Sequence, residues 1–83
     1  MKPTKEQVMD ENNQFATPNN GPWKLLHTWD NFWWIGNIET GVSKKIGPVQ
    51  LRGKNYYGEA VIEAARRNEK ITGITFEGLA DYL

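Results

Sequence analysis

The sequence predicts a small α+β domain: an antiparallel sheet of three to four strands packed on one main helix in the C-terminal half, with a loosely held N-terminal arm. All four tryptophans lie between Trp23 and Trp34, in a stretch whose aromatic and β-branched residues favour strands. Residues 56–68 instead repeat small apolar residues at helical spacing. Burying one tryptophan removes roughly 200 Å² from water, which is worth about 5 kcal/mol. The placement of these rings therefore decides the architecture.

The chain has 83 residues, enough for one domain. We divide it into an N-terminal arm, residues 1–22, and a single α+β domain, residues 23–83. In the arm, Thr4 and Gln7 match a capping box and predict a short helix that runs to about Asn12. The following segment is rich in Asn, Pro and Gly, as connectors are, and we expect it to dock through Phe15.

Three strands are expected after the arm, over residues 23–29, residues 32–38, and residues 42–46 with a continuation over 49–52. A helix is the alternative for the first of them, because Lys24-Leu25-Leu26-His27 suits either structure. Asp30–Asn31 supplies a two-residue turn before the second strand, and Gly41 supplies the positive φ of a three-residue loop after it. The third strand is expected to break at Gly47–Pro48. Because Pro48 cannot donate to a ladder, it marks an edge, a bulge or a strand end.

Side-chain alternation gives the second strand two apolar faces. Phe32 and Trp34 lie on one face, and Trp33 and Ile35 lie on the other. A helix of this chain can cover one face. The other needs a further segment of the chain, a second copy or a partner.

The clearest helix is expected over residues 56–68, with Asn55 as its N-cap. An apolar stripe at helical spacing consists of Tyr57, Ala60, Val61, Ala64 and Ala65. Its small alanines allow the helix to lie close to a sheet with bulky residues. We expect a last strand over residues 71–76 and a helical turn over residues 77–83.

The composition limits the classes of function. Ten basic and ten acidic residues balance, so no net charge draws the protein to nucleic acid or to an anionic membrane. The chain contains no cysteine, and no apolar run approaches the ~18 residues of a membrane span. We therefore expect a cytoplasmic protein with no membrane segment.

Candidate catalytic residues are few. His27 is the single histidine and Ser43 the single serine, and no motif surrounds either. Glu59 and Glu63 have i, i+4 spacing on the expected helix, which is typical of a solvated face. The acidic residues show no ligand spacing for a metal. We predict a protein that is not an enzyme and has no catalytic residue, metal or cofactor.

The order of three strands and an Ala-rich helix resembles the DNA-binding domain of ethylene-response factors and the arm-binding domain of tyrosine integrases. The likeness covers residues 32–67 and rests on Phe32-Trp33-Trp34, Lys45-Ile46-Gly47 and Glu59-Ala60-Val61. Those families read the major groove with an Arg-rich sheet face. The first two expected strands here contain no arginine, so the resemblance implies a fold rather than a function.

The aromatic stretch allows three interpretations: core packing, a surface for a protein partner, or base stacking beside basic residues. We predict a small non-enzymatic binding protein that occludes a protein partner, of the kind that phages and mobile elements encode as accessory or inhibitor proteins, for example anti-defence factors. The alternative is a nucleic-acid-binding module that uses an aromatic and basic sheet surface. The predicted partner-binding residues are Trp29, Trp33, Ile35, Lys44, Lys45, Arg52, Lys54 and Tyr56.

We also expect a homodimer. Without the arm, only about sixty residues form the core, and domains of that size are marginal unless they are stapled or paired. Pairing the face around Trp33 and Ile35 in two copies would bury apolar surface. The alternative is a monomer in which Phe15, Phe76 and Leu79 cover that face.

Overall fold

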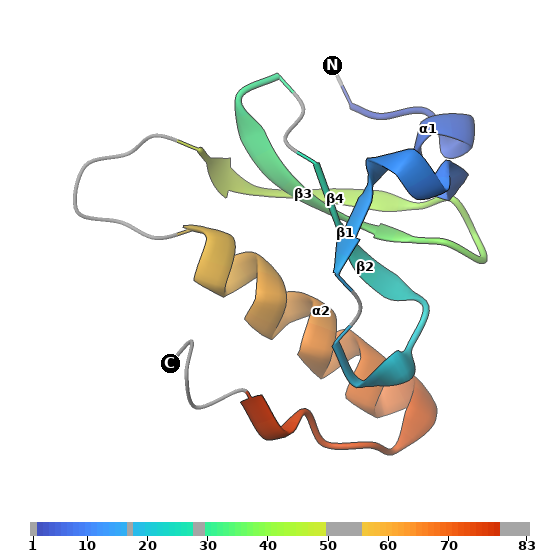
Figure 1. Cartoon of the computed structure of the whole chain (residues 1–83), viewed down its shortest axis with the longest axis vertical. Helices are drawn as coiled ribbons and strands as arrows, with labels where there is room; N and C mark the ends of the chain where they lie inside the picture. The colour runs from blue at the N-terminus through green and yellow to red at the C-terminus, as the bar shows by residue number, and fades with distance from the viewer. Residues whose placement is uncertain (1, 17, 28–29, 50–55, 79–83) are drawn as a thin grey trace.

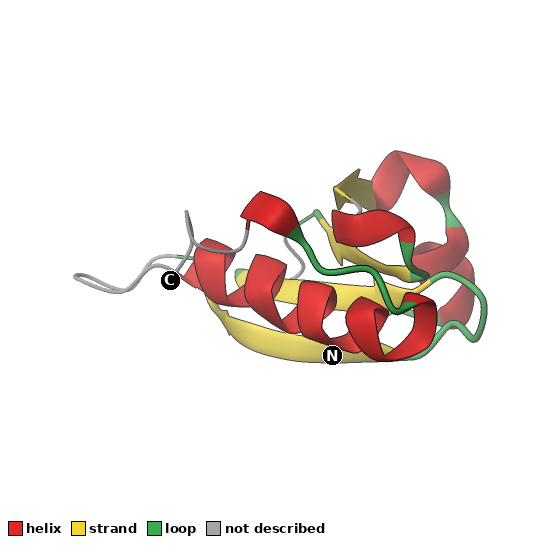
Figure 2. Cartoon of the chain, turned by 90° about the horizontal axis from the view of Figure 1, so that it is seen from below, coloured by secondary structure: helices red, strands yellow, loops and turns green. Residues whose placement is uncertain are grey.

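The computed structural model describes residues 2–16, 18–27, 30–49 and 56–78, and it confirms the predicted α+β class. A four-stranded antiparallel sheet, in the order β1-β2-β3-β4, carries one long helix along one face (Figures 1 and 2). The main elements are α1 (Lys5–Met9), β1 (Gln14–Ala16), β2 (Trp23–Leu26), β3 (Phe32–Asn37), β4 (Ser43–Pro48) and α2 (Tyr56–Thr72). Two short 3₁₀ helices are η1 (Glu11–Asn13) and η2 (Pro18–Asn20).

The N-terminal arm begins with the predicted capping box. The Thr4 hydroxyl accepts a hydrogen bond from the Gln7 amide at 3.2 Å, and the Gln7 side chain accepts one from the Thr4 amide at 2.8 Å. The helix ends at Met9, before the expected Asn12, because Asp10 adopts an extended conformation and starts η1. The arm then contributes β1, which pairs with β2 and gives the sheet its fourth strand.

Asp30 and Asn31 have φ of 57° and 66°, the left-handed conformations expected of turn residues, while residues 28–29 before them lie outside the described residues. Gly41 has a φ of 77° in the loop between β3 and β4. The side-chain carbonyl of Asn37 accepts hydrogen bonds from two amides of that loop and fixes its shape.

The third predicted strand, β4, differs from its prediction in one respect. It continues through Gly47 and ends at Pro48, where a break was expected. The irregularity lies one residue earlier, because Trp33 and Trp34 pair with Gly47 and Lys45 and leave Ile46 as the extra residue of a bulge. Pro48 is the last residue of an edge strand, where a missing N–H costs little. The predicted continuation to residue 52 extends outside the described residues.

The core consists of two clusters on opposite faces of the sheet, as the alternation along β3 predicted. The cluster under α2 contains Trp23, Leu25, Ile35, Ala60, Val61 and Ala64. The cluster on the other face contains Val8, Leu26 and Trp34, with Phe32 packed against it. Val8 is fully buried, so α1 of the arm covers this second face. Each apolar face thus has a cover from the same chain.

The predicted last strand over residues 71–76 is wrong. Ile71 and Thr72 belong to α2, and residues 73–76 form no strand. The helix continues past its predicted end at Asn68. The side chain of Asn68 is buried in the core, so this residue lies within the helix and does not end it. Gly73, with a φ of 73°, ends the helix, and its amide donates to the Glu69 carbonyl at 2.8 Å.

The predicted dimer surface is also wrong in its location. Ile35 is fully buried beneath α2 within one copy, so this face is not open to a second copy. Alternation shows which residues share a face, but it does not show which face the helix covers. Phe76 packs against the same cluster, as in the monomeric alternative. The side chain of Phe15 and all of Leu79 lie outside the described residues, and homodimerisation through another surface stays a prediction.

Candidate functional site

The candidate site is a surface that we call the β4–α2 face: the outer edge of β4 and the solvent-facing side of α2. β4 is the last strand of the sheet, and within the described ranges only β3 pairs with it, which leaves its other edge without a strand. A groove of about 400 Å³ runs between the strand and the helix. It is lined by Lys44, Lys45, Ile46, Glu59, Ile62, Glu63 and Arg66.

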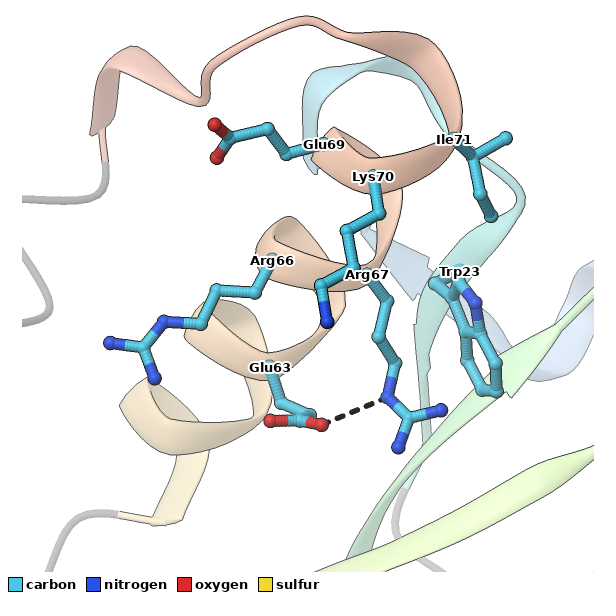
Figure 3. A pocket seen from close by; sticks show the side chains of 7 residues that line it. All are labelled: Trp23, Glu63, Arg66, Arg67, Glu69, Lys70 and Ile71. Atoms are coloured by element: carbon cyan, nitrogen blue, oxygen red, sulfur yellow. Dashed lines mark hydrogen bonds and ion pairs between the residues drawn. The ribbon is translucent and has the colours of Figure 1, made fainter.

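A second hollow, of about 770 Å³, continues along α2 (Figure 3). It is lined by Trp23, Glu63, Arg66, Arg67, Glu69, Lys70 and Ile71. The two hollows are neighbours along α2, because Glu63 and Arg66 line both of them. Ile71 contributes an exposed apolar side chain, with 58% of its surface accessible. The β4–α2 face therefore combines apolar side chains with charges of both signs.

Glu63 is the electrostatic centre of this face. Its Oε1 accepts a hydrogen bond from Arg67 Nε at 2.8 Å and lies 3.3 Å from Lys44 Nζ. The Arg67 hydrogen bond, aided by Lys44, lowers the pKa of Glu63 below its ordinary value, although partial burial acts in the opposite direction. This network links α2 directly to the edge strand.

Arg67 lies between Glu63 and Trp23 (Figure 3). Its guanidinium carbon is 4.6 Å from the centre of a Trp23 ring, a distance at which the cation is attracted to the ring face. Trp23 itself is 7% exposed, so the arginine covers the edge of the core. Its guanidinium group is held by Glu63 and by the Trp23 ring and lines the second hollow.

The other cations of this face are accessible to a partner. Arg66 and Lys70 are exposed and form no ion pair with any residue in the described ranges. Arg66 extends away from Trp23 in Figure 3. Lys45 lies on the opposite side of the sheet from Lys44, with its Nζ 4.4 Å from the centre of the Phe32 ring. An approaching partner therefore meets positive charge on both sides of the β4 edge.

The predicted partner-binding residues fall in three groups. Lys44 and Lys45 lie on the β4–α2 face. Trp33 packs edge-on against Tyr57 at 5.2 Å, Ile35 is buried, and the Tyr56 ring occupies the space in front of Gly47. The others, Trp29, Arg52 and Lys54, lie outside the described residues. Of the residues that can be placed, the two lysines line the groove, Trp33 and Tyr56 are half-buried, and Ile35 is fully buried.

Sequence reasoning missed the helix side of this face. Ile62 and Arg66 are four positions apart, at i and i+4, and lie on the side of α2 opposite the buried alanines. The spacing was visible in the sequence. What it does not show is that this side of the helix lies next to Lys44.

Two of the four tryptophans, Trp23 and Trp34, are core residues. Trp23 is 7% exposed and Trp34 is 6% exposed, and they belong to different clusters on opposite faces. The core-packing interpretation therefore applies to both rings. In the described part of the chain, neither of them offers a platform for stacked bases.

The candidate catalytic pair does not come together. Ser43 pairs with Gly36, which pairs with Lys24, three residues before His27. Two strand spacings of about 4.8 Å and three residues of about 3.3 Å each separate the two backbones by roughly 14 Å, too far for a Ser–His hydrogen bond. The described residues also contain no group of three or more His, Asp or Glu side chains placed to hold a metal ion.

Comparison with known protein families, curated proteins and solved structures finds no match. The expected likeness to ethylene-response-factor and integrase domains gains no support from these comparisons. Among the helices that the structure describes, none is sufficiently long and apolar to cross a membrane. The function of this chain is therefore argued from its own residues.

Proposed function

We propose that this chain is a small non-enzymatic binding protein that occludes a protein partner, and that the β4–α2 face makes the contact. The observation that supports this most directly is the groove between β4, the last strand of the described sheet, and the outer side of α2, with a second hollow beside it. Strand edges offer backbone donors and acceptors to a partner, and helix faces offer side chains. One surface here offers both.

The residue types on this face also support a protein partner. Interface centres are enriched in arginine and in large apolar and aromatic residues. Arg67 is held against Trp23 and Glu63, and Ile71 is exposed beside it. A side chain that is already fixed loses little conformational entropy on binding. The Arg67 network is thus a suitable centre for a contact surface.

The alternative is a nucleic-acid-binding module that uses Lys44, Lys45 and the helix arginines. It is less well supported because Trp23 and Trp34 are buried and three glutamates share the face with the cations. It predicts affinity for mixed DNA or RNA that falls steeply between low and physiological salt. A gel-shift assay at two salt concentrations distinguishes the alternatives, since the protein-partner proposal predicts no shift at either.

The proposal is tested by affinity capture from a lysate of the source organism. The test variant is Lys44→Glu/Arg66→Glu, and the control is Lys2→Glu/Lys5→Glu, the same charge change on exposed residues of the arm. We expect one protein to be retained by the wild type and the control, with or without nuclease, and lost from the test variant. Equal retention by all three chains contradicts the assignment to this face. Loss on nuclease treatment favours the nucleic-acid alternative.

The non-enzymatic part of the proposal has its own test. In a broad hydrolase screen we expect no turnover by the purified chain. Turnover that Ser43→Ala or His27→Ala abolishes would contradict it.

The proposed origin in a phage or mobile element rests on size and composition alone. If the chain is an anti-defence factor, its expression in bacteria that carry defence systems should raise the plating efficiency of a restricted phage. Unchanged plating across a panel of such hosts would contradict this part of the proposal.

A further inference from the structure

We propose that the β4–α2 face binds an extended, acidic segment of its protein partner, which adds to the sheet as a fifth strand beside β4. This inference rests on the proposed function and specifies the chemistry of the partner. β4 has six residues, a usual strand length, and in the described ranges it pairs with β3 alone. Its other edge therefore has the geometry that strand addition requires.

Two consecutive lysines determine the charge of the added strand. Lys44 faces α2, where its Nζ lies 3.3 Å from Glu63. Lys45 faces the other side, over Phe32. In a strand added beside β4, two consecutive side chains also point to opposite sides of the sheet. One of them lies next to Lys44 on the α2 side, and the other lies next to Lys45 on the far side. Adjacent Asp or Glu residues in the partner would pair with both ammonium groups.

The groove determines the next residue of the pattern. Ile46 packs on the α2 side of the sheet, and Ile62 lines the same groove from the helix. A partner residue beside Ile46 points into this groove, where an apolar side chain fits. Every strand pair in the sheet is antiparallel. An antiparallel segment would therefore read apolar–acidic–acidic from its N-terminus to its C-terminus.

The balance of charges on the groove favours this occupant. Three cations, Lys44, Lys45 and Arg66, and two anions, Glu59 and Glu63, line the groove, and Arg67 adds a further cation at Glu63. The exposed guanidinium of Arg66 extends the positive surface along α2. An acidic segment thus gains more attraction than repulsion.

The same lysines argue against a second copy of this chain as the occupant. If two β4 strands paired around a two-fold axis at Lys44 or Lys45, that lysine would lie opposite the same lysine of the second copy. Like charges at such positions destabilise the pair, and lysines on edge strands are a common protection against self-pairing. A partner with acidic residues converts this repulsion into attraction.

The test uses fluorescein-labelled synthetic peptides of about ten residues, the length of a long strand. The first contains an apolar–Glu–Glu core between alternating Thr and Val. The second replaces Glu–Glu with Gln–Gln, and the third is the first with N-methylated backbone amides. Binding is measured by fluorescence anisotropy. We expect the acidic peptide to bind about tenfold more tightly than the Gln–Gln peptide, the effect of two surface ion pairs. The N-methylated peptide, which cannot form a ladder, should not bind.

Charge reversal gives a second arm that does not depend on loss of binding alone. Lys44→Glu/Lys45→Glu should weaken the acidic peptide about tenfold and should bind a Lys–Lys peptide instead, a gain that an unfolded variant would not show. Lys2→Glu/Lys5→Glu should behave as wild type.

Equal binding of the acidic and Gln–Gln peptides, or undiminished binding of the N-methylated peptide, would overturn the inference. So would a wild-type dimer in sedimentation that Lys44→Glu/Lys45→Glu alters. If lysate capture succeeds while the peptides fail, the proposed function stands and this inference does not.

Discussion

Asn68 and Trp23, 45 residues apart, are joined by two hydrogen bonds that fasten α2 to the start of β2. The Trp23 amide donates to Asn68 Oδ1 at 2.8 Å, and Asn68 Nδ2 donates to the Trp23 carbonyl at 2.9 Å. Asn68 is fully buried, so water cannot replace either hydrogen bond. The contact fixes the position of α2 relative to β2. It therefore also fixes the position of Arg67, the residue before Asn68.

Asn68→Ala should lower the free energy of unfolding by about 2–4 kcal/mol, because it leaves two buried backbone groups of Trp23 without their partners. Urea denaturation measures the change. Asn12→Ala, at an exposed residue of η1, is the matched control and should stay within about 0.5 kcal/mol of wild type. Equal stability of the two variants would show that the Asn68 contact does not support the fold.

Gly21→Ala should cost about 1–3 kcal/mol, since a β-carbon there would clash with the Asn68 side chain and both residues are buried. Asn68→Ala removes two of the three nearest atoms, so in that background the same glycine substitution should cost less. Chemical denaturation of the two single variants and the double variant measures this coupling. Additive changes would contradict the predicted crowding. Gly73→Ala, with no atom near its β-carbon, should show no coupling to Asn68.

Val8→Ala should reduce the free energy of unfolding by about 1–3 kcal/mol, because Val8 is fully buried against Leu26 and Trp34 on the second face of the sheet. The neighbouring Met9 is 39% exposed, and Met9→Ala should cost clearly less. Thermal unfolding followed by circular dichroism compares the two. A larger effect at Met9 would mean that α1 presents a different side to the sheet.

Stability should fall at acid pH partly through Glu63. The pKa of this carboxylate is lowered in the folded state, so its contribution is present above the unfolded pKa and is lost as the pH falls through the folded pKa. Arg67→Gln removes the main cause of the lowered pKa and should flatten this part of the pH dependence. Arg66→Gln, next to it but without an ion pair to Glu63, should keep the wild-type profile. Urea midpoints from pH 3 to pH 7 measure both, and identical profiles would contradict the assignment.

Local features of the fold were predictable from short-range chemistry. The capping box of Thr4 and Gln7, the positive φ of Gly41 and the two faces of β3 each follow from residues that are neighbours in the sequence. The end of α2 did not follow. Asparagine is common at the C-terminal ends of helices, and Asn68 was expected to end α2. Its burial depends instead on Trp23, which is distant in the sequence.

The candidate site was half predictable. Lys44 and Lys45 stand out in the sequence as consecutive cations beside a proline-terminated strand. Arg66 and Ile62 join them because α2 crosses the sheet at an angle that packing of the whole core determines. The expectation that Ile35 faces a partner failed for the same reason, since the position of the helix decides which face is buried.

Amide hydrogen exchange of the chain, free and bound to its captured protein partner, tests the central claim most directly. The outward-facing amides of β4, within residues 43–47, should become strongly protected in the complex, while the amides of α1 keep their free exchange rates. Protection of α1 or β1, with β4 exchanging equally in the free and bound chain, would contradict it.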